Sequence, residues 1–135
     1  MVEKNISLPT DRLPVIRVVA MPKDTNPGGS IFGGWIMSQI DTAAAIPALE
    51  RAKGRVVTVA VNSIEFHEPV FVGDVISCYA EIIKTGKTSI TVKVDVYAER
   101  NPSDPETVKV TEAELTYVAL DENRRPRLLP DVNDE

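Results

Sequence analysis

The feature that most constrains the fold is a glycine-rich turn that runs directly into a nearly apolar helix. Four glycines stand between Asp24 and Asp41, and from Trp35 to Leu49 the only polar positions are Ser38, Gln39, Asp41 and Thr42. A helix on a protein surface normally shows polar residues along one side. A helix that is apolar nearly all round is therefore predicted to lie inside a protein or an assembly.

One carboxylate, Asp41, is embedded in this helix. Burial of a carboxylate is costly unless the group is hydrogen-bonded or used in chemistry. Two interpretations are open: Asp41 is a satisfied structural group, or it is an active-site acid. The glycine turn can likewise be interpreted in two ways, as a structural turn or as a ligand site. In a ligand site the first N–H groups of the helix, at Gly33 and Gly34, would point at a polarised oxygen.

Length and composition narrow the class of protein. The chain has 135 residues, 43% of them hydrophobic, which suits one domain with a sizeable core. The net charge of −5 removes any general attraction to nucleic acid or anionic lipid. One cysteine and one histidine exclude a disulfide framework and argue against a Cys/His zinc site. With neither a signal-peptide pattern nor a membrane-length apolar run in the sequence, we expect a soluble cytoplasmic protein.

The order of elements predicts an α+β fold. Residues 1–14 form a polar, loose arm, residues 15–130 a single domain, and residues 131–135 an acidic tail. The helix begins near Gly33 and ends near Gly54, a good C-terminal stop, and Pro47 should bend or break it. Strands are expected at 15–20, 55–66, 75–84, 88–99 and 107–120.

The strands are expected to form one antiparallel sheet that curls around the helix. In the segment 88–99 apolar residues alternate with polar ones, as in a half-buried strand, and the apolar set is Ile90, Val92, Val94, Val96 and Ala98. Sequential strands joined by short turns favour antiparallel pairing. One sheet covers only one face of a helix, so the remaining apolar surface predicts a second subunit.

Other candidate groups have plain interpretations. Cys78 alternates with apolar neighbours in its strand and is predicted to be inert core. His67 ends a strand and is predicted to be solvated or at an interface, not a catalytic base. The sequence has neither a Gly-x-Ser-x-Gly elbow nor a phosphate-binding glycine motif, which argues against a serine hydrolase and a nucleotide-binding loop.

The segment from Asn26 to Asp41 closely resembles the hotdog-fold acyl-CoA thioesterases, particularly the bacterial YciA-type branch. The similarity continues at 54–59, 69–74, 86–89 and 111–113, and covers most of residues 15–130. The resemblance implies a long antiparallel sheet wrapped around a central helix. It also implies homodimers with continuous sheets and active sites at the dimer interface, commonly arranged as hexameric trimers of dimers.

The resemblance also implies the roles of individual residues. Asp41 would be the catalytic carboxylate, acting as general base or as nucleophile, with Asn26 as a polar partner from the other subunit and Thr58 near the site. The N–H groups at Gly33 and Gly34 would polarise the thioester carbonyl. Candidates for binding coenzyme A, which is part of the substrate, are Arg55, Gly86, Lys87, Thr88, Ser89, Arg124 and Arg127.

The implied activity is hydrolysis of acyl-CoA to a carboxylic acid and coenzyme A, without a metal or a separate cofactor. Two alternatives on the same fold stay open. The first is a non-catalytic domain that binds acyl-CoA, against which the presence of both Asn26 and Asp41 argues. The second is a dehydratase, which normally needs a histidine in the site, whereas His67 lies outside the motif at the start of the helix.

Overall fold

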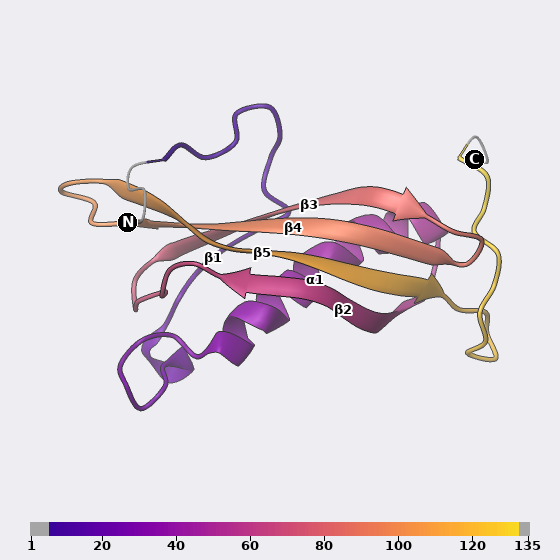
Figure 1. The fold of residues 1–135 in the computed structure, drawn as a ribbon, viewed down its shortest axis with the longest axis horizontal. Coiled ribbons are helices and arrows are strands. Elements are labelled where there is room, and N and C mark those ends of the chain that lie inside the picture. Colours follow the sequence, from indigo (N-terminus) through magenta and orange to yellow (C-terminus); the bar gives the residue numbers. More distant parts are fainter. Residues whose placement is uncertain (1–5, 133–135) are drawn as a thin grey trace.

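The computed structural model describes residues 6–132, so the first five residues of the arm and the end of the acidic tail lie outside the described part. A five-stranded antiparallel sheet packs along one side of a single long helix (Figure 1). The strand order is β1-β3-β4-β5-β2, which confirms the predicted α+β architecture of a long sheet around a central helix. The elements are β1 (Ile16–Val19), the short helix η1 (Pro22–Asp24), α1 (Gly33–Ala52), β2 (Val56–Phe66), β3 (Val75–Thr85), β4 (Ser89–Arg100) and β5 (Glu106–Ala119).

The core lies between the sheet and α1. The predicted alternation in β4 is confirmed, because each residue of its apolar set has no exposed surface: Ile90, Val92, Val94, Val96 and Ala98. Small residues let the helix approach the sheet closely, and the buried side of α1 consists of Ile36, Ile40, Ala43, Ala44, Ala48 and Ala52. Full burial of each valine or isoleucine contributes about 1.5–3 kcal/mol, so this contact stabilises the chain substantially.

The sheet covers only one side of α1. Met37, Ile46 and Leu49 remain exposed in the single chain, as predicted for a helix too apolar for one sheet. Pro47 lies inside α1 but does not break it. The φ angle that proline imposes is compatible with a helix, and proline removes only one backbone N–H donor. A helix whose turns before and after the proline are firmly packed therefore continues through it. No helix among the described residues has the length and apolar character that crossing a membrane requires.

Strand β2 lies at an edge of the sheet and contains two irregularities. Its pairing with β5 shifts between Thr58 and Ala60 and again between Val61 and Ser63. Each shift adds one residue to β2 relative to β5, as in a β-bulge. Thr58, Val61 and Ile64 therefore pair with Tyr117, Leu115 and Ala113, which alternate along β5 and face the core. A strictly alternating strand would have placed Val61 on the opposite face from Thr58.

The predictions for Cys78 and His67 are confirmed. Cys78 is fully buried, and burial raises the pKa of its thiol to about 12. The side chain of His67 is exposed.

The described part of the N-terminal arm is docked, which corrects the expectation of a loose segment. Arg12 donates a 3.0 Å hydrogen bond to the carboxylate of Asp95 and lies over the ring of Tyr79. At the other end of its described part, the N–H of Ile6 donates to the carbonyl of Thr107 at 3.2 Å. The arm is therefore fastened to the sheet at these points.

Candidate active site

The carboxylate of Asp41 lies on the side of α1 that faces β2. Thr58 Oγ1 donates a 2.8 Å hydrogen bond to Asp41 Oδ1, and the hydroxyl of Tyr117 donates to the same oxygen at 2.6 Å. Oδ2 has no hydrogen-bond partner within the described part of the chain. Asp41 is exposed in the single chain, which corrects the expectation of burial. The sequence shows that Asp41 has apolar neighbours in the helix, but the sheet of the same chain leaves some of those neighbours uncovered. Asp41 is therefore less buried than its neighbours suggest.

The two hydroxyl groups reach Asp41 because of the strand register. Thr58 and Tyr117 are direct partners in the pairing of β2 with β5, so both face α1. The first bulge of β2 follows Thr58 immediately, and bulges commonly redirect side chains next to functional sites. The sequence analysis missed Tyr117. A signal was available, because a tyrosine at a core-facing position needs a partner for its hydroxyl.

A cavity of about 280 Å³ opens beside Asp41. Most of its surface is apolar, with the polar groups of Ser38, Asp41 and Thr58 on one side. The complete lining consists of Gly34, Met37, Ser38, Ile40, Asp41, Thr58, Val61, Ile64 and Leu115. An apolar cavity with a few converging polar groups is typical of a small-molecule site. It suits a ligand that has an apolar chain next to a reactive polar group.

The start of α1 offers free hydrogen-bond donors next to this cavity. Phe32, the N-cap residue, makes no side-chain cap. Within residues 6–132 the N–H groups of Gly33 and Gly34 have no acceptor. Gly34 borders the Asp41 cavity, whereas Gly33 borders a neighbouring hollow that includes Phe66 and His67. A Cβ atom at Gly34 would overlap the ring of Phe32, so the backbone here runs close beneath an exposed aromatic side chain.

Asn26 does not border the Asp41 cavity of its own chain. Its Nδ2 donates to Ser30 Oγ at 3.1 Å, and its backbone closes the turn by accepting from Gly29 N–H. Asn26 Oδ1 is buried and has no partner among the described residues. A buried acceptor without a donor is unusual, because most such groups are satisfied. The single chain thus brings Thr58 and Asp41 together but leaves Asn26 apart.

The residues predicted to bind coenzyme A lie elsewhere, at the end of α1. The turn between β3 and β4, which carries Gly86, Lys87, Thr88 and Ser89, lies at the same end of the molecule as the C-terminal segment (Figure 1). Arg55 and Arg127 border a hollow of about 400 Å³ there. The guanidinium of Arg127 also donates to the carbonyls of Ala52 and Leu120, which ties down the helix end. Arg124 is exposed in a tight turn.

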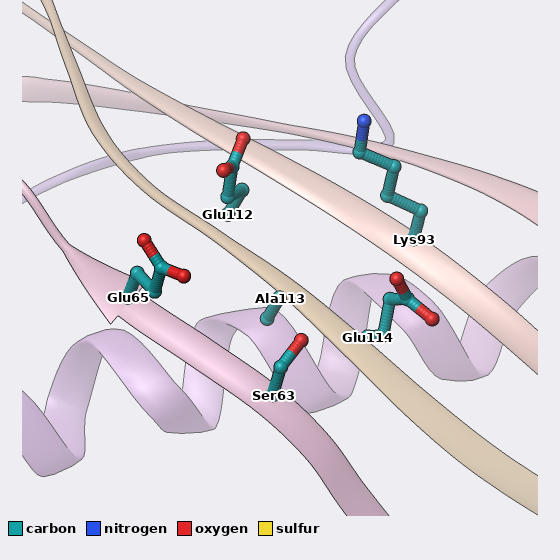
Figure 2. Close-up of a pocket in the computed structure, with 6 residues that line it drawn as sticks. All are labelled: Ser63, Glu65, Lys93, Glu112, Ala113 and Glu114. Carbon is teal, nitrogen blue, oxygen red and sulfur yellow. The ribbon is translucent and has the colours of Figure 1, made fainter.

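A second group of acidic side chains lies away from Asp41, over β2, β4 and β5 (Figure 2). Glu65 and Glu112 are direct partners across β2 and β5. Cations of the chain balance this group, because Lys109 Nζ lies 3.0 Å from a Glu112 carboxylate oxygen and Lys93 pairs across the strands with Glu114. Unlike the Asp41 cavity, this acidic group is not bordered by the start of α1 with its free N–H groups, and its lining is mainly polar.

The sequence of the chain matches the family model of the thioesterase superfamily over residues 28–103. The chain belongs to this superfamily. It is 51% identical over 118 residues to the acyl-CoA thioester hydrolase YciA of Salmonella typhimurium, which covers 86% of this chain and 89% of the relative. The family predicted from the sequence, the hotdog-fold acyl-CoA thioesterases with a YciA-type branch, is thereby confirmed.

Solved structures agree with this assignment. A hexameric hotdog-fold thioesterase of Campylobacter jejuni superimposes with a TM-score of 0.86 at 44% identity, covering 90% of this chain and 93% of that one. A hexameric thioesterase of Yersinia pestis gives a TM-score of 0.83 at 51% identity, covering 92% of this chain and 99% of that one. The hotdog fold of this chain is therefore established together with its family.

Proposed function

We propose that this protein hydrolyses acyl-CoA thioesters to a free carboxylic acid and coenzyme A, with Asp41 as the reacting carboxylate. The observation that carries the proposal is the position of Asp41, which lines an apolar cavity bordered by the start of α1 and whose Oδ2 has no hydrogen-bond partner among the described residues. The acyl-CoA thioester hydrolases among its relatives support the same reaction.

The proposed chemistry follows from the groups at the cavity. A thioester carbonyl oxygen becomes negative as the carbonyl carbon is attacked, and the N–H of Gly34 would stabilise that charge. If Asp41 is the base, it takes a proton from water while the water oxygen bonds to the carbonyl carbon, and the C–S bond then breaks to release the thiolate of coenzyme A. If Asp41 is the nucleophile, its oxygen forms an acyl anhydride, the thiolate leaves, and water hydrolyses the anhydride.

Release of free thiol from acyl-CoAs of several chain lengths tests the proposal directly. Wild-type protein should release coenzyme A and acid in equal amounts over many turnovers. Tight binding of acyl-CoA with no thiol release would contradict hydrolysis and support the alternative, a binding domain without catalysis. Heavy oxygen found in Asp41 after a single turnover in labelled water would establish the nucleophile route, because the label enters the protein only when water attacks the Asp41 carbon of an acyl anhydride.

We also propose that the protein is a homo-oligomer, a dimer assembled further into a trimer of dimers. The surfaces that support assembly are the exposed apolar side of α1, with Met37 and Leu49, and the edge strand β2, where Val57, Val59 and Val61 are exposed. A long edge strand with exposed apolar side chains is open to pairing with another chain. The related thioesterases of Campylobacter jejuni and Yersinia pestis are hexameric.

Asn26 is proposed to complete the active site of a partner subunit. Its separation from the Asp41 cavity and its buried, unpartnered Oδ1 support this arrangement. A two-fold axis would place the loop of one chain over the helix of the other.

The remaining elements of the proposal concern the substrate and its surroundings. Arg55, Lys87, Arg124 and Arg127 stay candidates for the phosphates of coenzyme A, since guanidinium and ammonium groups pair well with phosphate. The proposed reaction uses no metal or separate cofactor, so full activity should remain after treatment with a chelator. A cytoplasmic location, where acyl-CoA is available, stays part of the proposal.

A further inference from the structure

The two oxygens of the Asp41 carboxylate differ in the hydrogen bonds that they accept. Thr58 and Tyr117 come from different strands, yet both donate to Oδ1, at 2.8 Å and 2.6 Å. Hydrogen bonds to an ionised group are the stronger kind, and two of them on one oxygen fix the plane of the carboxylate. The other oxygen, Oδ2, is left without a donor within the described residues.

Tyr117 is well suited to hold this geometry. Its side chain is 1% exposed, and its hydroxyl also lies 2.9 Å from the backbone carbonyl oxygen of Asp41. Both atoms to which its hydroxyl donates therefore belong to Asp41. Burial, together with the hydrogen bond and charge of the Asp41 carboxylate, raises the pKa of the Tyr117 phenol well above its ordinary value. The hydroxyl thus stays protonated, as a donor, throughout the neutral and mildly alkaline range.

We infer that Tyr117 is a positioning residue for the reaction: with Thr58 it holds Asp41 Oδ1, so that Oδ2 is the oxygen that meets the water or the thioester carbon. This inference rests on the proposed hydrolysis. Tyr117 does not border the cavity and need not touch the substrate, so its action passes through Asp41. Such positioning holds the reacting oxygen close to the atom that it attacks and in the correct orientation.

The competing explanation is that the hydroxyl only fastens α1 to β5. Replacement by Tyr117→Phe separates the two, with Tyr79→Phe as a matched control. Tyr79 is equally buried, at 2% exposed, but it packs against Tyr97 and Arg12, away from the Asp41 cavity. Both variants lose one hydroxyl from a buried ring, so any general effect of that loss on folding appears in both. Thermal unfolding of each variant is measured alongside its kinetics.

We expect Tyr117→Phe to lower kcat about tenfold or more, with little change in KM, since loss of a hydrogen bond to a charged group is commonly worth a factor of that size. Tyr79→Phe should leave both properties unchanged. A merely structural hydroxyl would change the melting temperature of Tyr117→Phe but neither kinetic property.

Thr58 provides a second approach to the same oxygen if Tyr117→Phe folds poorly. Thr58→Val should also lower kcat with little change in KM, and Thr58→Ser, which keeps a hydroxyl, should restore it. Because both donors act on one oxygen, the effects of Thr58→Val and Tyr117→Phe should not be additive. Folded variants that keep the kcat of an active wild type overturn the inference alone, whereas a wild type that releases no thiol overturns the proposed hydrolysis itself.

Discussion

Thr58 and Asp41 lie 17 positions apart in the sequence, on different elements, and a 2.8 Å hydrogen bond joins their side chains beside the cavity. This bond connects the edge strand β2 to α1 at the point where the first bulge follows. Anything that changes the register of β2 here also changes how the carboxylate is held.

The first prediction concerns this bond. Thr58→Val keeps the size and branching of the side chain but removes its hydroxyl. We expect kcat for acyl-CoA hydrolysis to fall several-fold, because Asp41 Oδ1 retains only the donor from Tyr117. Steady-state kinetics of thiol release checks the result. Thr58→Ser, which keeps the hydroxyl, should have little effect.

The carboxylate itself gives the second prediction. Asp41→Asn keeps the shape of the side chain and removes its charge and basicity, so turnover should fall by ~10²-fold or more. Asp104→Asn serves as the control, since Asp104 is exposed in the loop between β4 and β5. Near-normal turnover in a correctly folded Asp41→Asn protein would remove Asp41 from the mechanism.

The edge strand β2 leads to a prediction about assembly. Val59 is 54% exposed in the single chain, and Val59→Lys places a charge where pairing with a second β2 would bury it. The variant should dissociate toward smaller species by light scattering at micromolar concentration. Val132→Lys, at a position 79% exposed near the C-terminus, is the matched control. A stable, active wild-type monomer would contradict the proposed oligomer.

The placement of Asn26 allows a complementation experiment. Asn26→Ala and Asp41→Asn proteins should each be nearly inactive. When the two are unfolded and refolded together, part of the activity should return, because each mixed dimer would hold one intact site and one doubly altered site. Mass spectrometry verifies that mixed dimers have formed. If activity stays absent in verified mixed dimers, both residues act within one chain.

Acid stability depends on Asp95. Burial by itself would raise the pKa of this carboxyl, but hydrogen bonds from Lys109 and Arg12 outweigh burial and leave its pKa below the ordinary value. A depressed carboxyl pKa stabilises the folded chain above the unfolded-state value of about 3.9, and this contribution is lost as pH falls through the folded-state pKa. Asp95→Asn should therefore melt at a lower temperature near neutral pH and lose less stability on acidification than wild type, as measured by thermal unfolding.

Local pattern was enough to predict most of the fold. The alternation in β4 identified its buried residues, and the glycine turn with the apolar run located α1. The arm was misjudged because its polar, proline-containing sequence gives no sign that Arg12 meets Asp95, which lies 83 positions away. Such a contact depends on how distant segments pack, which periodicity does not report.

In the candidate site, too, local sequence features could be predicted and contacts between distant segments could not. Asp41 and its glycine motif are visible in sequence, and the resemblance added Thr58. The cavity residues Val61 and Ile64 were not identified, because two bulges in β2 decide which residues face the helix, and bulges arise from the pairing of two strands. Alternation along β5 predicts Tyr117 to be an ordinary core residue, because it reports the face of a side chain but not the partner of its hydroxyl.

Cys78 has a practical consequence for every kinetic experiment on this protein. It is the only cysteine of the chain, and its thiol is fully buried with its pKa raised to about 12. Thiol reagents react with the thiolate, so the folded protein should contribute almost no background to an assay of released coenzyme A. The same residue becomes reactive when β3 separates from its neighbours. Its rate of labelling therefore provides a built-in probe of sheet opening, recorded with the same reagent as the enzymatic reaction.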